Sequence, residues 1–374
     1  MVMTDRPRTE LHLAVAGLAA IGVSFGFARY GYGLFLPDLR AEFGLDMSTV
    51  GLISSGSYAG YLIALTLVGL LSARLGPRPM IIAAGLFATL GLTLVAVAQH
   101  PVLLVIGLLL AGASSGWAWA PYSDAVGALV PGDRRERVLA IVPNGTAFGT
   151  IVAGLLAIAV PWRPAWLVFA AAALAVTLYN AWLLRGLPRP TPAPPQPIRP
   201  TAEAVPLFAS AFSYGVLGSV YWTFAVDLIA DDTTGPLFWT LVGVAGLGGL
   251  YTASTLARIG LRRTHPLLFL MLATAIAVLA VAPGSVVAAG LSALLYGPAF
   301  MAVSAVLAVW SYQVFPARPA AGFSAVVFCL GLGTIAGPAT LGAVATGFGL
   351  PAAFLLTAVL AAATTLARPA TVRA

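Results

Sequence analysis

Residues 73–78 read ARLGPR and residues 257–262 read ARIGLR, so nearly the same hexapeptide recurs 184 positions further along the chain. One such match carries little weight, but four at the same offset indicate that the chain consists of two copies of one structural repeat. The other three matches are Tyr30-Gly31 with Tyr214-Gly215, Arg134 with Arg318, and Gly149-Thr150-Ile151 with Gly333-Thr334-Ile335.

The composition is that of a membrane protein. Of the 374 residues, 60% are hydrophobic and only 8% are charged, whereas soluble domains carry about 25% charged residues. A membrane-spanning helix needs about 20 mostly apolar residues, and a helix satisfies its own backbone hydrogen bonds in hydrocarbon. The sequence therefore predicts an all-α membrane protein with 12 transmembrane helices, at 11–37, 48–72, 79–98, 102–129, 138–160, 164–184, 205–230, 236–257, 266–282, 286–312, 320–346 and 350–367.

A proline-rich segment separates the two copies. Residues 185–203 read RGLPRPTPAPPQPIRPTAE, and seven of the thirteen residues from 188 to 200 are proline. Such a segment is extended and semi-rigid and does not form a helix. The sequence predicts an N-terminal six-helix bundle at 1–184, a cytoplasmic linker at 185–204 and a C-terminal six-helix bundle at 205–374.

The arginines are distributed unevenly between the two sides of the membrane. Sixteen of the 19 basic residues lie on the side of the termini and the linker, Arg40 and Arg163 lie on the other side, and Arg29 lies within a run. Because cytoplasmic loops are enriched in basic residues, the asymmetry predicts a multi-pass protein of the cell membrane with both termini in the cytoplasm. Six runs per copy is an even number, so the copies are parallel repeats related by a pseudo-twofold axis.

Several kinds of chemistry are excluded. No lysine is present, which excludes a P-loop and a lysine Schiff base. The single cysteine, Cys329, and three widely separated histidines offer no metal site, so neither a metal nor a cofactor is expected. The arginines form no basic stripe, so the expected partners are a small-molecule substrate and membrane lipids rather than nucleic acid.

The loop after the second run carries a family motif. Residues 69–78 read GLLSARLGPR, which resembles the pattern Gly-x-Leu-x-Asp-Arg-x-Gly-Arg-Lys/Arg of the major facilitator superfamily. Ala73 replaces the acidic residue and Pro77 replaces a basic one, so the cytoplasmic gate is expected to be weaker or built differently. Residues 26–30, GFARY, with Leu36-Pro37 resemble the YbfB/YjiJ-like branch of this family.

This resemblance implies a secondary active transporter for a small organic solute. It would work by rocker-switch alternating access as a monomer, coupled to protons, with symport and antiport both open. The alternatives are a non-transporting membrane receptor or sensor on a transporter scaffold, and a membrane-embedded transferase. No enzymatic activity is expected, because the cytoplasmic acids form no paired motif. The resemblance assigns the gate to Arg74, Gly76, Arg78, Asp124, Arg258, Gly260 and Arg262.

Arg29 is the deepest charge in the predicted membrane region. A charge at the bilayer centre costs on the order of 2.5–3.5 kcal/mol on insertion scales, so it needs a reason. One interpretation is that the guanidinium attracts a carboxylate or another anion of the solute. The other is a structural arginine that forms an internal ion pair or bonds backbone carbonyls. At helical spacing its face is small and aromatic, with Gly22, Phe25, Gly26, Tyr32, Gly33 and Leu36.

Two aspartates are candidates for proton coupling. Asp124 near the cytoplasmic end of the fourth run would carry a proton or, as we favour, form a gate ion pair with Arg74 or Arg78. Asp227 at the end of the seventh run is expected to be solvated, with a proton site or external gate as the alternative. Polar and aromatic side chains near the midpoints of runs complete the predicted substrate-binding set of Arg29, Tyr30, Tyr58, Trp117, Asn144, Tyr214 and Trp222.

Overall fold

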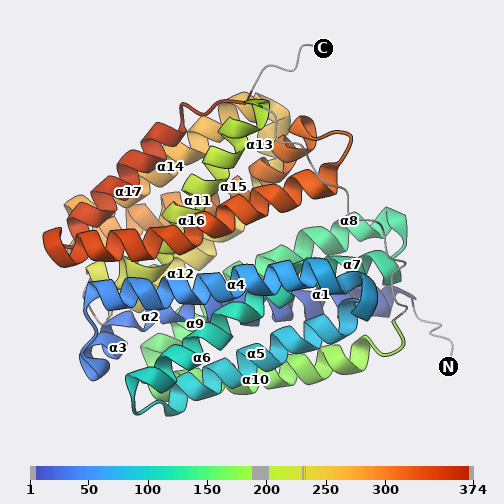
Figure 1. Ribbon diagram of the computed structural model, residues 1–374, viewed down its shortest axis with the longest axis horizontal. Coiled ribbons are helices and arrows are strands. Elements are labelled where there is room, and N and C mark those ends of the chain that lie inside the picture. Colours follow the sequence, from blue (N-terminus) through green and yellow to red (C-terminus); the bar gives the residue numbers. More distant parts are fainter. Residues whose placement is uncertain (1–5, 188–201, 230, 232, 370–374) are drawn as a thin grey trace. The chain divides into compact units, whose positions relative to one another are not determined.

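The computed structural model describes residues 6–187, 202–229, 231 and 233–369. This part of the chain contains helices and no strand (Figure 1). Eleven helical segments are long and apolar enough to cross a membrane, and Leu350–Thr364 is a shorter apolar helix of 15 residues. These segments coincide with the twelve predicted runs, and the all-α membrane fold is confirmed. Residues 188–201 of the predicted linker lie outside the described residues.

Eight of the predicted runs are uninterrupted α-helices. Their boundaries differ from the predicted ones by a few residues, because hydropathy does not mark where a helix begins. The eight are α4 (Met47–Leu75), α5 (Pro77–Val97), α10 (Trp162–Leu183), α11 (Val205–Ile229), α14 (Leu261–Val281), α15 (Val286–Val314), α16 (Pro319–Phe348) and α17 (Leu350–Thr364).

The other four runs are interrupted. Three contain a short 3₁₀ segment, and the first contains a π-helix, in which each turn holds an extra residue. The first run comprises α1 (Arg6–Ile21), the π-helix Gly22–Arg29, α2 (Gly31–Leu34) and α3 (Leu36–Phe43). The others comprise α6 (Pro101–Ser114), Ser115–Trp117 and α7 (Trp119–Leu129); α8 (Gly132–Ile141), Val142–Asn144 and α9 (Gly145–Ala159); and α12 (Thr234–Gly246), Leu247–Tyr251 and α13 (Thr252–Ile259).

The helices are grouped into two compact units. Unit 1 comprises Met1–Tyr32 and Ser57–Ala193, and unit 2 comprises Gly33–Gly56 and Pro194–Ala374. The second copy of the repeat therefore groups with a segment that follows Arg29 in the first. The predicted domain limits at 184 and 205 stay a prediction.

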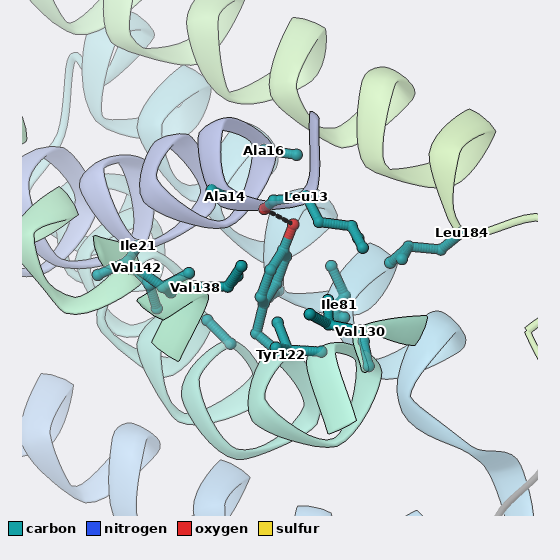
Figure 2. Packing of buried hydrophobic residues seen from close by; sticks show 14 residues of the cluster. Leu13, Ala14, Ala16, Ile21, Ile81, Tyr122, Val130, Val138, Val142 and Leu184 are labelled. Atoms are coloured by element: carbon teal, nitrogen blue, oxygen red, sulfur yellow. Dashed lines mark hydrogen bonds between the residues drawn. The ribbon is translucent and has the colours of Figure 1, made fainter. Parts of the chain in front are cut away.

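Unit 1 has a core built around a buried tyrosine. In Figure 2 the Tyr122 side chain of α7 points to α1, where its hydroxyl donates a hydrogen bond to the carbonyl of Leu13 at 3.0 Å. Aliphatic side chains from α1, α5, α8 and the end of α10 surround its ring, among them Ile81, Val138 and Leu184. The hydroxyl is satisfied in an apolar surrounding, so its burial fixes α7 against α1.

Unit 2 packs in the same manner of helix on helix. Here α11 lies along α16, and α14 lies between α15 and α17 (Figure 1). The start of α4 also belongs to this unit and begins at an N-cap. The backbone N–H of Thr49 donates to Asp46 Oδ1 at 2.6 Å, which lowers the pKa of the Asp46 carboxyl.

The repeated glycines have the same structural roles in both copies. Gly76 precedes α5 with φ 76°, and Gly260 precedes α14 with φ 75°, a conformation that favours glycine. A Cβ atom added at Gly149 would lie 3.0 Å from the Cα of Gly22, and one at Gly333 would lie 2.9 Å from the carbonyl carbon of Phe212. The offset of 184 thus relates equivalent turns and equivalent close approaches of helices.

Candidate functional site

Arg29 is the last residue of the π-helix and is buried, with 8% of its surface exposed. The π-helix reads GVSFGFAR, and its glycines lie directly against the backbone of α9. A Cβ atom added at Gly26 would lie 2.6 Å from the Cα of Gly149. Small residues at this contact let the two helices approach closely. This close contact holds the wide turns that carry Arg29.

Four aromatic rings surround the guanidinium of Arg29. The distances from its Cζ atom to the ring centroids are 3.9 Å for Tyr61, 4.8 Å for Tyr58, 5.4 Å for Phe25 and 5.8 Å for Tyr30. All four lie within the roughly 6 Å over which a ring face attracts a cation. We call Phe25, Tyr30, Tyr58 and Tyr61 the aromatic cage. It stabilises a buried positive charge without neutralising it.

The polar contacts of Arg29 leave its Nε donor unpartnered among the described residues. Its Nη1 donates to Ser115 Oγ at 3.2 Å, and that hydroxyl donates to the carbonyl of Gly112 at 2.9 Å. Its Nε is buried and has no hydrogen-bond partner among the described residues. Within the same residues no carboxylate pairs with Arg29, because the ion pairs found there join other side chains. The internal ion pair that we considered from the sequence is therefore not formed with any carboxylate in the described part of the chain.

Two further predicted binding residues of unit 1 lie outside the cage. The ring of Trp117 packs against Phe87, with centroids 6.1 Å apart. Asn144 is half-buried, and its Nδ2 donates to the carbonyl of Ile141 at 3.3 Å. The structure thus brings Arg29, Tyr30 and Tyr58 together and places these two elsewhere in unit 1.

The predicted binding residues of unit 2 lie in an aromatic core. The Tyr214 hydroxyl donates to the carbonyl of Phe300 at 2.8 Å. Trp222 is 2% exposed, and its ring meets Trp239 edge-on at 5.0 Å and Phe300 at 5.6 Å. These contacts give both side chains a packing role.

Asp227 was expected to be solvated, and this expectation is wrong. Its side chain is 6% exposed and pairs with Arg40 of α3, whose Nη1 lies 2.7 Å from Oδ2 and 2.9 Å from Oδ1. The Nε of Arg40 also donates to the carbonyl of Leu45 at 3.1 Å. Sequence reasoning missed this partner because the two residues are 187 positions apart. As a proton carrier Asp227 would first have to leave Arg40.

Asp124 was expected to pair with Arg74 or Arg78, and the structure holds neither ion pair. Asp124 and Arg74 are exposed, while Nη2 of Arg78 donates to the carbonyl of Ala181 at 3.1 Å. The physical reason is that Arg78 at the start of α5 reaches across to α10 rather than to α7. In the second copy, Arg258 and Arg262 are exposed on either side of Gly260. The gating role of these residues stays a prediction.

Three contacts of Arg29 were missing from the predicted binding set. Phe25 lies four residues before Arg29, on the predicted face of the same helix. Tyr61 lies three residues after Tyr58, so helical periodicity places both on one face of α4. No signal in the sequence points to Ser115, because its contact with Arg29 joins residues 86 positions apart.

Known proteins resemble the chain over about half of its length or more. The family described as "Uncharacterised MFS-type transporter YbfB" matches residues 21–368. Monocarboxylate transporter 11 of Homo sapiens is 35% identical over 217 residues, which are 55% of this chain and 45% of that protein. The putative uncharacterized transporter YgaY of Escherichia coli (strain K12) is 30% identical over 189 residues, 49% of this chain and 47% of that protein. The chain thus spans about half the length of these two relatives.

Solved structures have the same fold. The crystal structure of a peptide transporter, POT, superposes with a TM-score of 0.79, covering 98% of this chain and 94% of that chain, at 15% sequence identity. At this identity the likeness shows the fold alone. Together with the match over residues 21–368, it shows that the chain belongs to the YbfB-like family of major facilitator superfamily transporters.

Proposed function

We propose that this transporter is a secondary active carrier for a small organic anion and that Arg29 binds the anionic group. The observation that carries the proposal is a buried arginine that has no carboxylate partner and keeps an unpartnered Nε donor among the described residues, which include every ring of the cage and Ser115.

A carboxylate fits this arrangement better than a neutral ligand does. The planar fork of arginine offers two parallel N–H donors to a carboxylate, and such charge-assisted hydrogen bonds are roughly twice as strong as neutral ones. Ring faces alone contribute about 2 kcal/mol or more to a desolvated cation, which leaves part of the burial cost for an arriving anion to offset. The name of the human relative, Monocarboxylate transporter 11, agrees with an anionic solute.

The transport cycle that fits this family is rocker-switch alternating access. In the proposed cycle the protein works as a monomer in the cell membrane with cytoplasmic termini, as the arginine asymmetry suggests. Protons are the proposed coupling ion, with Asp124 as the more accessible carrier, because Asp227 is engaged by Arg40. Uptake by symport and export by antiport both fit these features.

Flux through reconstituted proteoliposomes tests the proposal. Radiolabelled pyruvate and benzoate serve as probes, and the wild type is compared with Arg29→Gln and Arg29→Lys. We expect Arg29→Gln to reduce the flux at least about tenfold and Arg29→Lys to retain part of it, because lysine keeps the charge but loses the fork. Arg263→Gln is the matched control, since Arg263 is an exposed arginine at the start of α14.

Unchanged flux in Arg29→Gln contradicts the proposed role of Arg29. Binding without flux in the wild type indicates a receptor on a transporter scaffold instead. An imposed pH gradient tests the coupling, because a proton-coupled flux responds to the gradient and Asp124→Asn should weaken that response. A flux that ignores the gradient refutes proton coupling.

A further inference from the structure

Two columns of side chains face each other inside unit 1. Each column has residues at a spacing of four, which places them on one face of a helical segment. The segments run in opposite directions, and their end residues meet in the Arg29–Ser115 hydrogen bond of 3.2 Å. The columns are Ile21, Phe25 and Arg29 in the first run, and Ser115, Trp119 and Ser123 in the fourth.

The middle residues of the two columns, Phe25 and Trp119, are both aromatic. The rings of Phe25 and Trp119 meet edge to face, with centroids 6.0 Å apart and an interplanar angle of 71°. Phe25 belongs to the aromatic cage, so this pair of rings directly adjoins Arg29. Trp119 is 38% exposed, unlike the fully buried Trp166 of the same unit. It therefore presents ring surface that the protein itself does not cover.

The last residues of the two columns, Ile21 and Ser123, line a cavity. Trp119 also lines it, and the remaining walls are Leu139, Val142 and Pro143. The volume is about 140 Å³, far above the roughly 10–15 Å³ that one water needs on this measure. An engineered apolar cavity of roughly 150 Å³ accepts benzene. The cavity beside Trp119 is thus of the right size and polarity for one aromatic ring.

The distance between the charged end and the apolar end fits one small molecule. Arg29 and Ile21 are eight residues apart, which at about 1.5 Å of rise per residue is at most roughly 12 Å. The contacting rings of Phe25 and Trp119 lie between these two ends along the columns. A solute bound lengthwise would meet a guanidinium at one end, aromatic rings in the middle and aliphatic walls at the other end.

We propose that the cavity beside Trp119 binds the apolar end of the solute, and that the solute class is a carboxylate carrying a phenyl-sized apolar group on a short linker. The proposal rests on the proposed function, because Arg29 supplies the anion site. It adds a second subsite, made by the side chains of Ile21, Trp119, Ser123, Leu139, Val142 and Pro143.

Equilibrium binding to the purified full-length protein tests the subsite. Butyrate and phenylbutyrate are the probes, because they share a carboxylate and differ by the ring. We expect the wild type to bind phenylbutyrate about tenfold to hundredfold more tightly, as burial of a phenyl group implies. Ser123→Phe fills the cavity and should reduce this ratio to about one while leaving the affinity for butyrate within about twofold.

A second variant and a control complete the experiment. Trp119→Ala removes a wall and should also reduce the ratio, without filling the cavity. Ser254→Phe adds the same ring at an exposed position of α13 and should leave the ratio unchanged. A wild-type ratio near one, or a ratio that Ser123→Phe leaves intact, overturns the subsite.

Failure of the subsite and failure of the proposed function are distinguishable. If Arg29→Gln weakens butyrate binding but Ser123→Phe does not change the ratio, the anion site stands and the apolar subsite falls. If Arg29→Gln leaves butyrate binding unchanged, or if the wild type binds neither probe, the anion site falls and the subsite falls with it.

Discussion

The first helix of each copy shows how differently one repeat can be used. In the first copy, residues 6–43 form α1, a π-helix, α2 and α3, and the chain places Arg29 among four rings. In the second copy, α11 is a continuous helix of 25 residues. The position equivalent to Arg29 at the offset of 184 is Ser213, whose Oγ lies 2.6 Å from Thr364 Oγ1.

The difference separates what the two copies share from what each does. They share turns and close helix contacts, as Gly76 and Gly260 illustrate. In α11 the Tyr221 hydroxyl has a partner within the unit, 2.8 Å from Ser292 Oγ. In the π-helix Nη1 of Arg29 bonds Ser115, but its Nε has no hydrogen-bond partner among the described residues. The two copies therefore form similar scaffolds, but of the equivalent positions Arg29 and Ser213 only Arg29 carries a charge.

An arginine placed in α11 at the position equivalent to Arg29 tests the difference between the two copies most directly. Ser213→Arg places a charge in a buried position where Ser213 Oγ now contacts Thr364 Oγ1. We expect a loss of about 3 kcal/mol in the free energy of unfolding, measured by denaturant unfolding in detergent. Ser213→Ala is the control and should cost about 1 kcal/mol, the typical worth of one hydrogen bond. Equal stability of Ser213→Arg and the wild type would show that the cage is not what makes Arg29 tolerable.

The ion pair between Arg40 and Asp227 joins α3, the last helix of the interrupted first run, to α11. Arg40→Met leaves the buried Asp227 carboxylate unpartnered and should cost about 1–3 kcal/mol, less than for a fully buried pair because the Arg40 side chain is 31% exposed. The double variant Arg40→Met/Asp227→Leu should recover much of this loss. Additive losses in the double variant would mean that the pair does not stabilise unit 2.

The close helix contacts that both copies share predict equal losses of stability when equivalent glycines are substituted. Gly149→Ala and Gly333→Ala each force a methyl group against a neighbouring backbone, so each should lower the free energy of unfolding by about 1–3 kcal/mol. Gly290→Ala is the control, since a Cβ atom there meets nothing within 4 Å. A large effect at only one of the two repeated glycines would contradict the structural equivalence.

The smallest expected effect concerns a single ring of the cage. Tyr61→Leu removes the ring closest to the guanidinium and should cost about 0.5–2 kcal/mol of thermal stability or anion affinity. Tyr61→Phe keeps the ring face and should stay close to the wild type. If Tyr61→Phe loses as much stability or anion affinity as Tyr61→Leu does, the hydroxyl of Tyr61 rather than its ring face stabilises the guanidinium.

The sequence was sufficient for the fold because length and hydropathy specify spans almost independently of their neighbours. It did not reveal the π-helix or the 3₁₀ segments, since GVSFGFAR has the composition of any apolar helix. Their local geometry depends on packing against distant segments, here the glycines of α9.

The site was predictable only where contacts are local. Helical spacing placed Phe25 on the face of Arg29 and would also have selected Tyr61 beside Tyr58. The contacts with Ser115 and between Arg40 and Asp227 join residues 86 and 187 positions apart, which periodicity does not reach. The expected pairing of Asp124 rested on the family pattern, and this chain lacks the acidic residue of that pattern at Ala73.

The most direct test of an anion site at Arg29 compares the binding of benzoate and benzamide, which have nearly the same shape and differ in charge. We expect wild-type protein to bind benzoate at least about tenfold more tightly. Arg29→Gln should abolish that preference, whereas Arg263→Gln should keep it. Equal binding of the two ligands by the wild type, or an intact preference in Arg29→Gln, would contradict the account.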